Sequence, residues 1–181
     1  MSVIGFVGLP GSGKSEAAAV ADELGIPVVT MGDVIRAECR ERGLDPATEH
    51  GKIAKALREE NGPAAIAERS LPIIEAELET SEAVVVDGIR SAVEVEEFEA
   101  AFGDEFRLVS IEAPFETRKE RLNIRGRDAG AEDGGESLEE RDARELDFGM
   151  GEAMTQADIT IENTDSLEAF QEQIRSILTE P

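Results

Sequence analysis

The chain has 181 residues, of which 40% are hydrophobic, and it carries 41 acidic against 18 basic side chains, a net charge of −23. This length suits one domain with a sizeable core, and no apolar run approaches the roughly 20 residues of a membrane-spanning helix. The charge argues against binding to nucleic acid, which needs a basic face. A single cysteine excludes an internal disulfide framework, and the N-terminus shows no export signal. We therefore expect a cytoplasmic protein with neither a membrane nor a nucleic-acid partner.

The acidic residues are spread along the whole chain instead of forming one tail, and only four basic residues are lysines. One interpretation is a basic partner protein. The interpretation that we favour is a solvated acidic surface suited to a salt-rich cytoplasm, where the Debye length falls to about 3 Å at 1 M salt and repulsion is screened.

The first predicted elements surround a glycine-rich loop. Residues 8–15 read GLPGSGKS, which matches the pattern G-x-x-x-x-G-K-[ST] between an apolar run at 3–7 and an alanine-rich helical stretch that ends near Leu24. Such a loop points backbone N–H groups at phosphate oxygens, and the helix that follows adds its positive end. Lys14 can reach the β- and γ-phosphates, and the Ser15 hydroxyl can bind Mg²⁺. The predicted nucleotide-binding set is Gly8, Leu9, Pro10, Gly11, Ser12, Gly13, Lys14 and Ser15.

Strands and helices alternate along the rest of the chain. Strands are predicted at 3–7, 26–30, 83–86, 106–111 and 159–161, and helices at 14–24, 33–42, 50–61, 62–79, 93–102, 115–125 and 167–178. Ser137 is predicted to cap another helix, because Glu140 follows at the spacing of a capping box. Five strands alternating with helices predict an α/β fold with a doubly wound parallel sheet and right-handed crossovers.

Asp87 ends a fully apolar strand and precedes Gly88. At the carboxyl end of a parallel sheet it would lie beside the glycine loop, where a carboxylate can hold Mg²⁺. The alternative is a simple Asp-Gly turn, but the neighbouring phosphate loop favours the metal role.

Arginines gather in residues 116–127, ETRKERLNIRGR. Arg118, Arg121 and Arg125 are spaced i, i+3 and i+7, which places them on one face of a helix. They and Arg127 directly precede a polar, glycine-rich stretch at 128–136, as phosphate-binding arginines of a closing lid would. The alternative is a surface helix with Glu–Arg pairs.

Two further arginines follow predicted strand ends: Arg36 in MGDVIRAE, three residues after Asp33, and Arg90 in DGIRS. A second anion lying across from the glycine loop would need basic groups at such places, although surface ion pairs would also explain them. Arg141 and Arg144 stay open between phosphate binding and pairing with glutamate. Cys39 is predicted to be a small core residue, and the lone His50 a polar surface residue.

Together these motifs resemble those of nucleoside monophosphate kinases, adenylate kinase above all, and they cover nearly the whole chain. The residues GLPGSGKS, MGDVIR, DGIR and NIRGR follow the order of that family. The stretch QADITIENTDSLEAF resembles dephospho-coenzyme A kinase instead, although the paired aspartates of those enzymes are replaced here by Thr30-Met31-Gly32-Asp33. The best overall match is an archaeal group of adenylate-kinase-related, dephospho-coenzyme A kinase-like proteins, and the acidic composition suits a halophilic member.

The resemblance implies one P-loop kinase domain over 1–181, with an acceptor-binding helical region at about 31–80 and a lid at about 118–145. It implies an ATP- and Mg²⁺-dependent phosphotransferase acting on a small phosphate-bearing acceptor such as a nucleoside monophosphate. Arg36 and, less closely, Arg90 in the shortened DGIR motif correspond to acceptor-binding arginines. Arg121, Arg125 and Arg127 correspond to the lid arginines. Dephospho-coenzyme A kinase and a nucleotide-operated regulatory ATPase are the alternatives.

Overall fold

The computed structural model describes residues 1–126 and 137–180, with side chains described for 1–123 and 137–180. Its five strands form one parallel sheet in the order β2-β3-β1-β4-β5. They are β1 (Ser2–Val7), β2 (Val28–Thr30), β3 (Ala83–Asp87), β4 (Phe106–Glu112) and β5 (Ile159–Glu162). The α/β fold with a five-stranded, doubly wound parallel sheet is therefore confirmed.

The central strand β1 is buried at every position after Ser2, as its unbroken apolar sequence predicts for a parallel strand covered on both faces. Its neighbours are β3 on one side, with Val3 opposite Val84, and β4 on the other, with Val3 opposite Phe106. The strand order changes direction around β1, so the loop after it lies at the crevice where open α/β sheets bind ligands.

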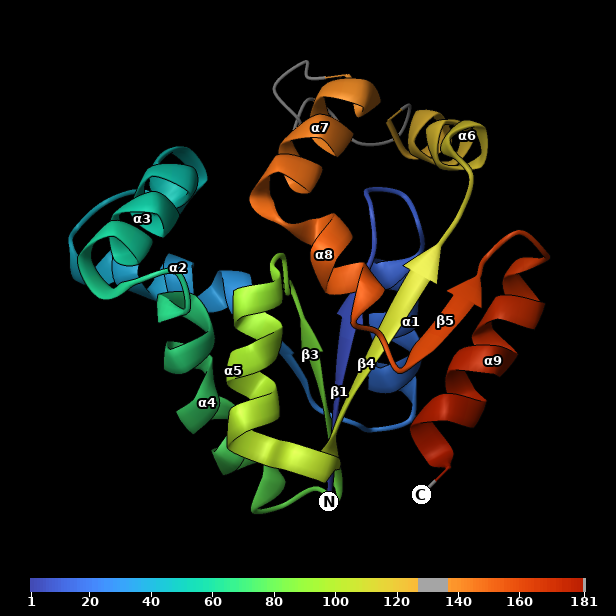
Figure 1. The fold of residues 1–181 in the computed structure, drawn as a ribbon, viewed down its shortest axis with the longest axis horizontal. Helices are drawn as coiled ribbons and strands as arrows, with labels where there is room; N and C mark the ends of the chain where they lie inside the picture. Colours follow the sequence, from blue (N-terminus) through green and yellow to red (C-terminus); the bar gives the residue numbers. More distant parts are fainter. Residues whose placement is uncertain (127–136, 181) are drawn as a thin grey trace.

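Helices cover both faces of the sheet (Figure 1). Helices α1 (Lys14–Glu23) and α9 (Leu167–Thr179) pack together on one face, over a core that includes Ile4, Phe6 and Ile174. The other face carries α4 (Ala65–Leu78), α5 (Ala92–Phe102) and α8 (Met150–Thr155), over a larger core that includes Leu57 and Phe98. The short 3₁₀ turn Gly103–Glu105 leads from α5 into β4.

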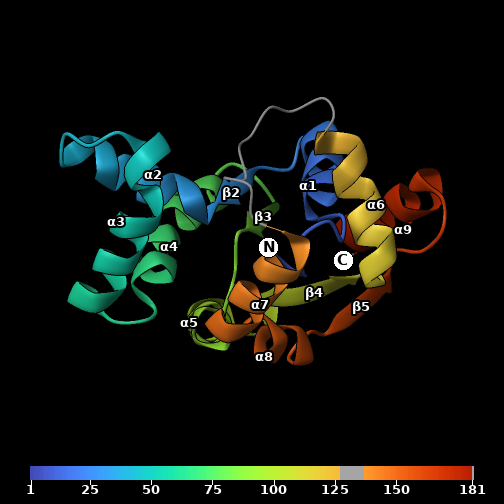
Figure 2. The same cartoon turned by 90° about the horizontal axis from the view of Figure 1, so that it is seen from above.

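Two groups of helices extend beyond the sheet and flank its carboxyl end. Helices α2 (Met31–Glu41) and α3 (Pro46–Asn61) form an arm on the β2 side, whereas α6 (Phe115–Gly126) and α7 (Leu138–Phe148) lie above the strand ends (Figures 1 and 2). Seen from above, α7 stands between the arm and α6 (Figure 2). This arrangement leaves α7 next to both sides of the crevice.

Most element boundaries follow the local signals in the sequence. The predicted capping box is present: Glu140 N–H donates to Ser137 Oγ, and Ser137 N–H donates to Glu140 Oε2. Helix α3 begins four residues before its predicted start, because Asp45 caps it and Pro46 occupies the first turn. Helix α8 was not predicted, since it is short and is separated from α7 only by Gly149, which has a φ of 119°. No helix in the described ranges is long and apolar enough to cross a membrane.

Candidate functional site

The glycine loop between β1 and α1 is built so tightly that no side chain would fit at Gly8 or Gly13. A Cβ added at Gly8 would lie 2.4 Å from the carbonyl oxygen of Ile111. At Gly13 it would lie 2.6 Å from Asn163 Nδ2, and the φ of Gly13, 124°, is one that other residues rarely adopt. Gly13 also begins α1 without a side-chain cap, so the N–H groups of the first turn face the loop's interior unsatisfied by the helix itself. This cradle fits an anion such as a triphosphate.

Lys14 turns its ammonium group back into the loop. Its Nζ donates to the carbonyl oxygen of Gly8 and lies 3.4 Å from that of Leu9. Desolvation by burial lowers the pKa of Lys14, while the nearby carboxylates of Asp87 and Glu145 partly oppose this shift. The site therefore contains a cation surrounded by polar oxygens at the place where a phosphate would bind.

The far side of the loop is held by residues of β5 and α6. Asn163 Nδ2 donates to the Ser12 carbonyl oxygen at 2.8 Å, and Arg121 Nη2 donates to the Asn163 carbonyl oxygen at 2.6 Å. The Ser12 hydroxyl is buried and has no hydrogen-bond partner in the described part of the chain. An unsatisfied buried hydroxyl beside the cradle is a further sign of a polar ligand there.

Asp87 and Ser15 are the candidates for binding Mg²⁺. Asp87 ends β3, half-buried, and its charge acts on Lys14, which places its carboxylate on the loop side of the sheet edge. Ser15 is exposed in the first turn of α1. One hydroxyl and one carboxylate suit Mg²⁺, which usually keeps several waters and takes its other ligands from phosphate oxygens.

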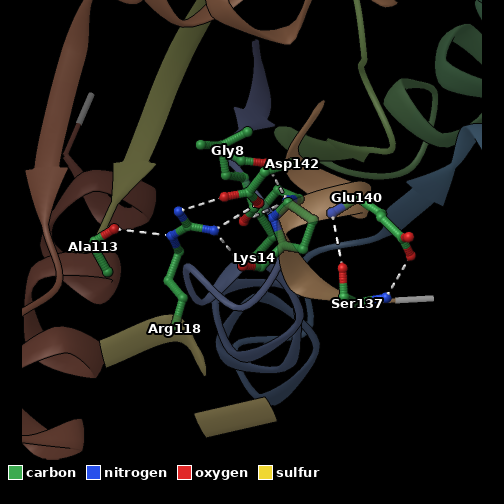
Figure 3. Close-up of polar contacts among 9 residues, drawn as sticks. Gly8, Lys14, Ala113, Arg118, Ser137, Glu140 and Asp142 are labelled. Carbon is green, nitrogen blue, oxygen red and sulfur yellow. Dashed lines mark hydrogen bonds and ion pairs between the residues drawn. The ribbon is translucent and has the colours of Figure 1, made fainter. Parts of the chain in front are cut away.

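Arg118 joins three parts of the site, as Figure 3 shows. Its Nε donates to the carbonyl oxygen of Ala113 at 3.0 Å, and its Nη1 donates to that of Pro10 in the glycine loop at 3.2 Å. The two Nη atoms also hold both carboxylate oxygens of Asp142 on α7, each at 2.8 Å. Arg118 is almost fully buried, at 4% exposure. Its contacts thus fix α6, the loop and α7 together, whereas the sequence grouped it with lid arginines that would bind phosphate directly.

Across α7 from the loop lies a second cavity, about 790 Å³ in volume, between the helical arm and α7. This volume lies within the roughly 300–1,000 Å³ of small-molecule sites. In a chain with only 18 lysines and arginines, four of them line this one cavity. The charged, titratable and aromatic residues of its lining are His50, Lys55, Arg58, Glu59, Arg90, Arg144 and Phe148.

The guanidinium groups of Arg58 and Arg90 both contact the ring of Phe148, at 4.4 and 4.9 Å from its centroid. Glu94, which is fully buried on α5, lies beneath them: it accepts a bond from the Arg90 backbone N–H at 2.8 Å, and its Oε1 is 3.6 Å from Arg58 Nη2. Burial raises the pKa of Glu94 and lowers that of Arg58. Glu94 thus fixes the backbone at Arg90 and lies within ion-pair distance of the Arg58 guanidinium group.

No motif in the sequence singled out Arg58 or Phe148, and Glu94 was counted among the solvated acidic residues. In the helix predicted at 93–102, the apolar side chain of Val93 is exposed and the carboxylate of Glu94 is buried. The helical period could have indicated this burial. Glu94 lies four residues before the buried Phe98 and so shares its helix face, whereas Val93 lies five residues before it.

The predicted acceptor residues separate into two groups. Arg90 lines the cavity and is held by Glu145 of α7. Arg36 instead forms an i, i+3 ion pair with Asp33 at the exposed surface of α2, close to Gly32 and His50. His50, predicted as a polar surface residue, is half-buried and lines the cavity next to Gly32. Cys39 is buried, as predicted.

The remaining lid residues are described only in part. Arg121 donates to the carbonyl oxygens of Ser12 in the glycine loop and of Asn163, and its role toward the transferred phosphate stays a prediction. Arg125 belongs to α6, but its side chain lies outside the described residues, and Arg127 lies outside them entirely. Arg144 of α7 lines the cavity beside the helical arm, and Arg141 lines a separate cavity between α6 and the start of α7.

Comparison with known proteins agrees with this geometry. A family model described as an AAA domain matches residues 7–139. A UPF0200 protein of Halobacterium salinarum is 60% identical over 178 residues, which cover 98% of this chain and 93% of the relative. The chain belongs to the UPF0200 family. Another UPF0200 protein, from Methanothrix thermoacetophila, is 50% identical and covers 99% of this chain and 98% of its own.

Solved structures with a similar fold include kinases of small molecules. A shikimate kinase from Bacteroides thetaiotaomicron has a TM-score of 0.58 at 17% identity, covering 99% of both chains. A gluconokinase from Sinorhizobium meliloti has a TM-score of 0.59 at 18% identity, covering 98% of this chain and 91% of its own. At these identities the likeness establishes a P-loop kinase-like fold for this member of the UPF0200 family, and nothing about its substrate.

Proposed function

We propose that this protein is an ATP- and Mg²⁺-dependent kinase that transfers the γ-phosphoryl group to a small phosphate-bearing acceptor, a nucleoside monophosphate. One observation carries the proposal: a phosphate cradle and a cationic cavity flank the same helix, α7, in a protein that is otherwise strongly acidic. A protein that only hydrolysed ATP would have no use for the second, cationic cavity.

The donor would bind along the glycine loop, residues 8–15. Backbone N–H groups of the loop and of the first turn of α1 would hold its phosphates, together with Lys14. Lys14 already rests on the carbonyl oxygens of Gly8 and Leu9, so it needs only to exchange these partners for phosphate oxygens. Ser15 and Asp87 would hold Mg²⁺, which supplies charge neutralisation between the phosphates when bound.

The acceptor would fill the cavity beside α7. Arg90 and Arg58, oriented by Glu94 and Phe148, would bind its phosphate with their planar guanidinium groups. The volume of the cavity suits an acceptor that carries a body as well as an anionic group. Arg36 and Asp33, on the neighbouring surface of α2, would meet the acceptor only after rearrangement of their ion pair.

The chemical step would rest on positioning and charge neutralisation. An oxygen of the acceptor phosphate would form the new bond to the γ-phosphorus while the bond to the β-phosphate oxygen breaks, and ADP leaves with that electron pair. The attacking oxygen is already ionised, so no general base is required. Arg121, Arg125 and Arg127 are proposed to stabilise the charge of the transferred group, and exclusion of water would suppress hydrolysis.

The test is a screen of acceptors. Purified protein with ATP and Mg²⁺ in molar KCl would be offered AMP, CMP, GMP, UMP, dephospho-coenzyme A, shikimate and gluconate, with ADP release and phosphorylated products both measured. We expect a nucleoside monophosphate to stimulate ADP release and to become a diphosphate, and the variant Arg90→Ala to raise its KM. Phosphorylation of dephospho-coenzyme A or of a sugar acid would replace the acceptor assignment. ADP release that no acceptor stimulates would favour a regulatory ATPase.

A further inference from the structure

The carboxylate of Glu145 on α7 accepts hydrogen bonds from the guanidinium group of Arg90, as an anionic ligand would. Arg90 Nε donates to Glu145 Oε2 at 3.1 Å, and Arg90 Nη2 donates to Oε1, so the pair is bidentate. The Glu145 side chain is 12% exposed and that of Arg90 is 31% exposed. This fork-to-carboxylate geometry is also the one with which arginine binds phosphate.

The Glu145 carboxylate acts on cations from three separate elements. Besides Arg90, which follows β3, its negative charge partly opposes the lowering of the pKa of Lys14 in the glycine loop and of Arg58 on α3 by burial. Lys14 belongs to the donor side, and Arg58 and Arg90 line the acceptor cavity. Glu145 therefore places one negative charge near the junction of the two sides, where transfer between bound phosphates would occur.

The other nearby carboxylates have different positions. Glu94 is fully buried below Arg58 and Arg90, and it accepts a backbone N–H bond that fixes it in place. Asp87 ends a strand of the sheet. Of these three carboxylates, only Glu145 belongs to α7, the helix that lies over the crevice (Figure 2). Asp87 belongs to the sheet, and Glu94 belongs to a helix that packs on the face of the sheet. Glu145 is the carboxylate that could withdraw without disrupting the core.

We propose that Glu145 is a competing internal counter-ion that sets the affinity of the acceptor site: it holds Arg90, and the phosphate of the acceptor must displace it to bind. This proposal rests on the proposed function, because it takes the cavity beside α7 to be the acceptor site. Because Glu145 must first be displaced from Arg90, the apparent affinity of the site is lowered by the same factor for every anion. A lone bulk anion, abundant in a salt-rich solution, then fails to compete. An acceptor whose body also fills the cavity retains enough affinity to bind.

The test compares Glu145→Gln with a matched control, Glu139→Gln. Glu139 lies on the same helix, but it is 60% exposed and faces Lys119 of α6 at 3.9 Å, away from the cavity. Binding of inorganic phosphate and of AMP would be measured by calorimetry at one fixed KCl concentration. We expect Glu145→Gln to bind both about tenfold more tightly, the scale of one partly buried, charge-assisted pair that no longer has to be broken. Glu139→Gln should bind them as the wild type does.

A double-variant cycle separates this role from a structural one. In an Arg90→Ala background, Glu145→Gln should no longer tighten phosphate binding, because the counter-ion has lost its partner. Weaker or unchanged phosphate binding by Glu145→Gln, with a lowered Tm, would overturn the proposal. It would mean that the Arg90–Glu145 pair only stabilises the fold. If AMP is phosphorylated but Glu145→Gln does not tighten its binding, the inference fails and the kinase proposal survives. If phosphate binding tightens but no acceptor is phosphorylated, the counter-ion role of Glu145 is supported and the kinase proposal fails. Absence of phosphate and AMP binding in all variants would overturn both.

Discussion

Arg118 and Asp142 form a bidentate ion pair that ties helix α6 to helix α7 directly above the glycine loop (Figure 3). The same guanidinium group donates to the carbonyl oxygen of Pro10 within the loop. Arg118 is nearly fully buried, so it is held by its partners and not by water. The position of α7, which carries Glu145 and Phe148, is therefore linked to the conformation of the glycine loop.

Replacing Asp142 by Ala should destabilise the fold strongly, since it leaves the Arg118 charge buried without its counter-ion. Breaking a buried pair in this way costs about 3–5 kcal/mol. Urea unfolding at constant KCl would measure the change. Arg175→Ala is the control, because its pair with Glu23 spans 2.9 Å but is exposed and should contribute at most about 1 kcal/mol. Similar small losses in both variants would contradict the role of Arg118 as a buried link.

Lys14→Ala should lower phosphoryl transfer by roughly 10²–10³, the scale of losing one preorganised group that stabilises charge. The fold should be retained, because Lys14 bonds only to carbonyl oxygens of its own loop. Steady-state ADP release with a stimulating acceptor would test this, beside circular dichroism of the variant. Lys52→Ala, at an exposed position on α3, serves as the control. Turnover at the wild-type rate in Lys14→Ala would remove the loop from the proposed mechanism.

The sequence was sufficient for those features that local chemistry determines. The glycine loop, the buried central strand and the Ser137 capping box each depend on residues that are neighbours in the chain, and each was predicted correctly. The cavity between the helical arm and α7 was not predictable in the same way. Its lining joins α3, the turn after β3 and α7, so Arg58, Arg90 and Phe148 come together only through the tertiary fold.

The surroundings of charged side chains were the hardest to predict, because a residue being arginine or glutamate does not indicate which group it will pair with. Arg118 and Arg121 are three residues apart on one helix, yet the first is buried against Asp142 and the second reaches the carbonyl oxygen of Asn163. Glu94 is fully buried in a helix whose other glutamates favoured a solvated surface. A burial pattern anchored on Phe98 would have separated Glu94 from them.

His50 should report the binding of an anion in the acceptor cavity. Burial lowers its pKa, a hydrogen bond with the Gly32 backbone partly opposes this shift, and the charges of Arg36, Arg90 and Arg58 lower the pKa further. A bound phosphate would offset these positive charges and should raise the pKa of His50. Because the chain has one histidine, a single imidazole signal in an NMR titration would follow this without assignment. A pKa that inorganic phosphate and AMP leave unchanged would place their binding elsewhere.

The same pKa shift predicts how stability depends on pH. A histidine whose pKa is lower in the folded than in the unfolded state binds fewer protons when folded, so folding becomes more favourable as pH rises through this window. The contribution of His50 is therefore complete above its ordinary pKa of 6.5 and is lost as pH falls through its folded value. Urea unfolding of His50→Gln should lose this component of the pH dependence and keep the rest. Identical pH profiles for both proteins would contradict the assignment.

Salt should stabilise the protein from about 0.1 M KCl towards molar concentrations, because screening relieves repulsion among the 41 acidic residues. Thermal unfolding across a KCl series would measure this as a rising Tm. The double variant Glu96→Gln/Glu99→Gln removes two exposed charges from α5, and it should raise the Tm at low salt and by less at high salt. This convergence separates screening from a general effect of salt on hydrophobic burial, which would raise both proteins equally. A Tm that is flat or falls with KCl would show that the acidic surface is not an adaptation to salt. It would favour a basic partner protein, and binding to such a partner would then be expected to weaken as KCl rises.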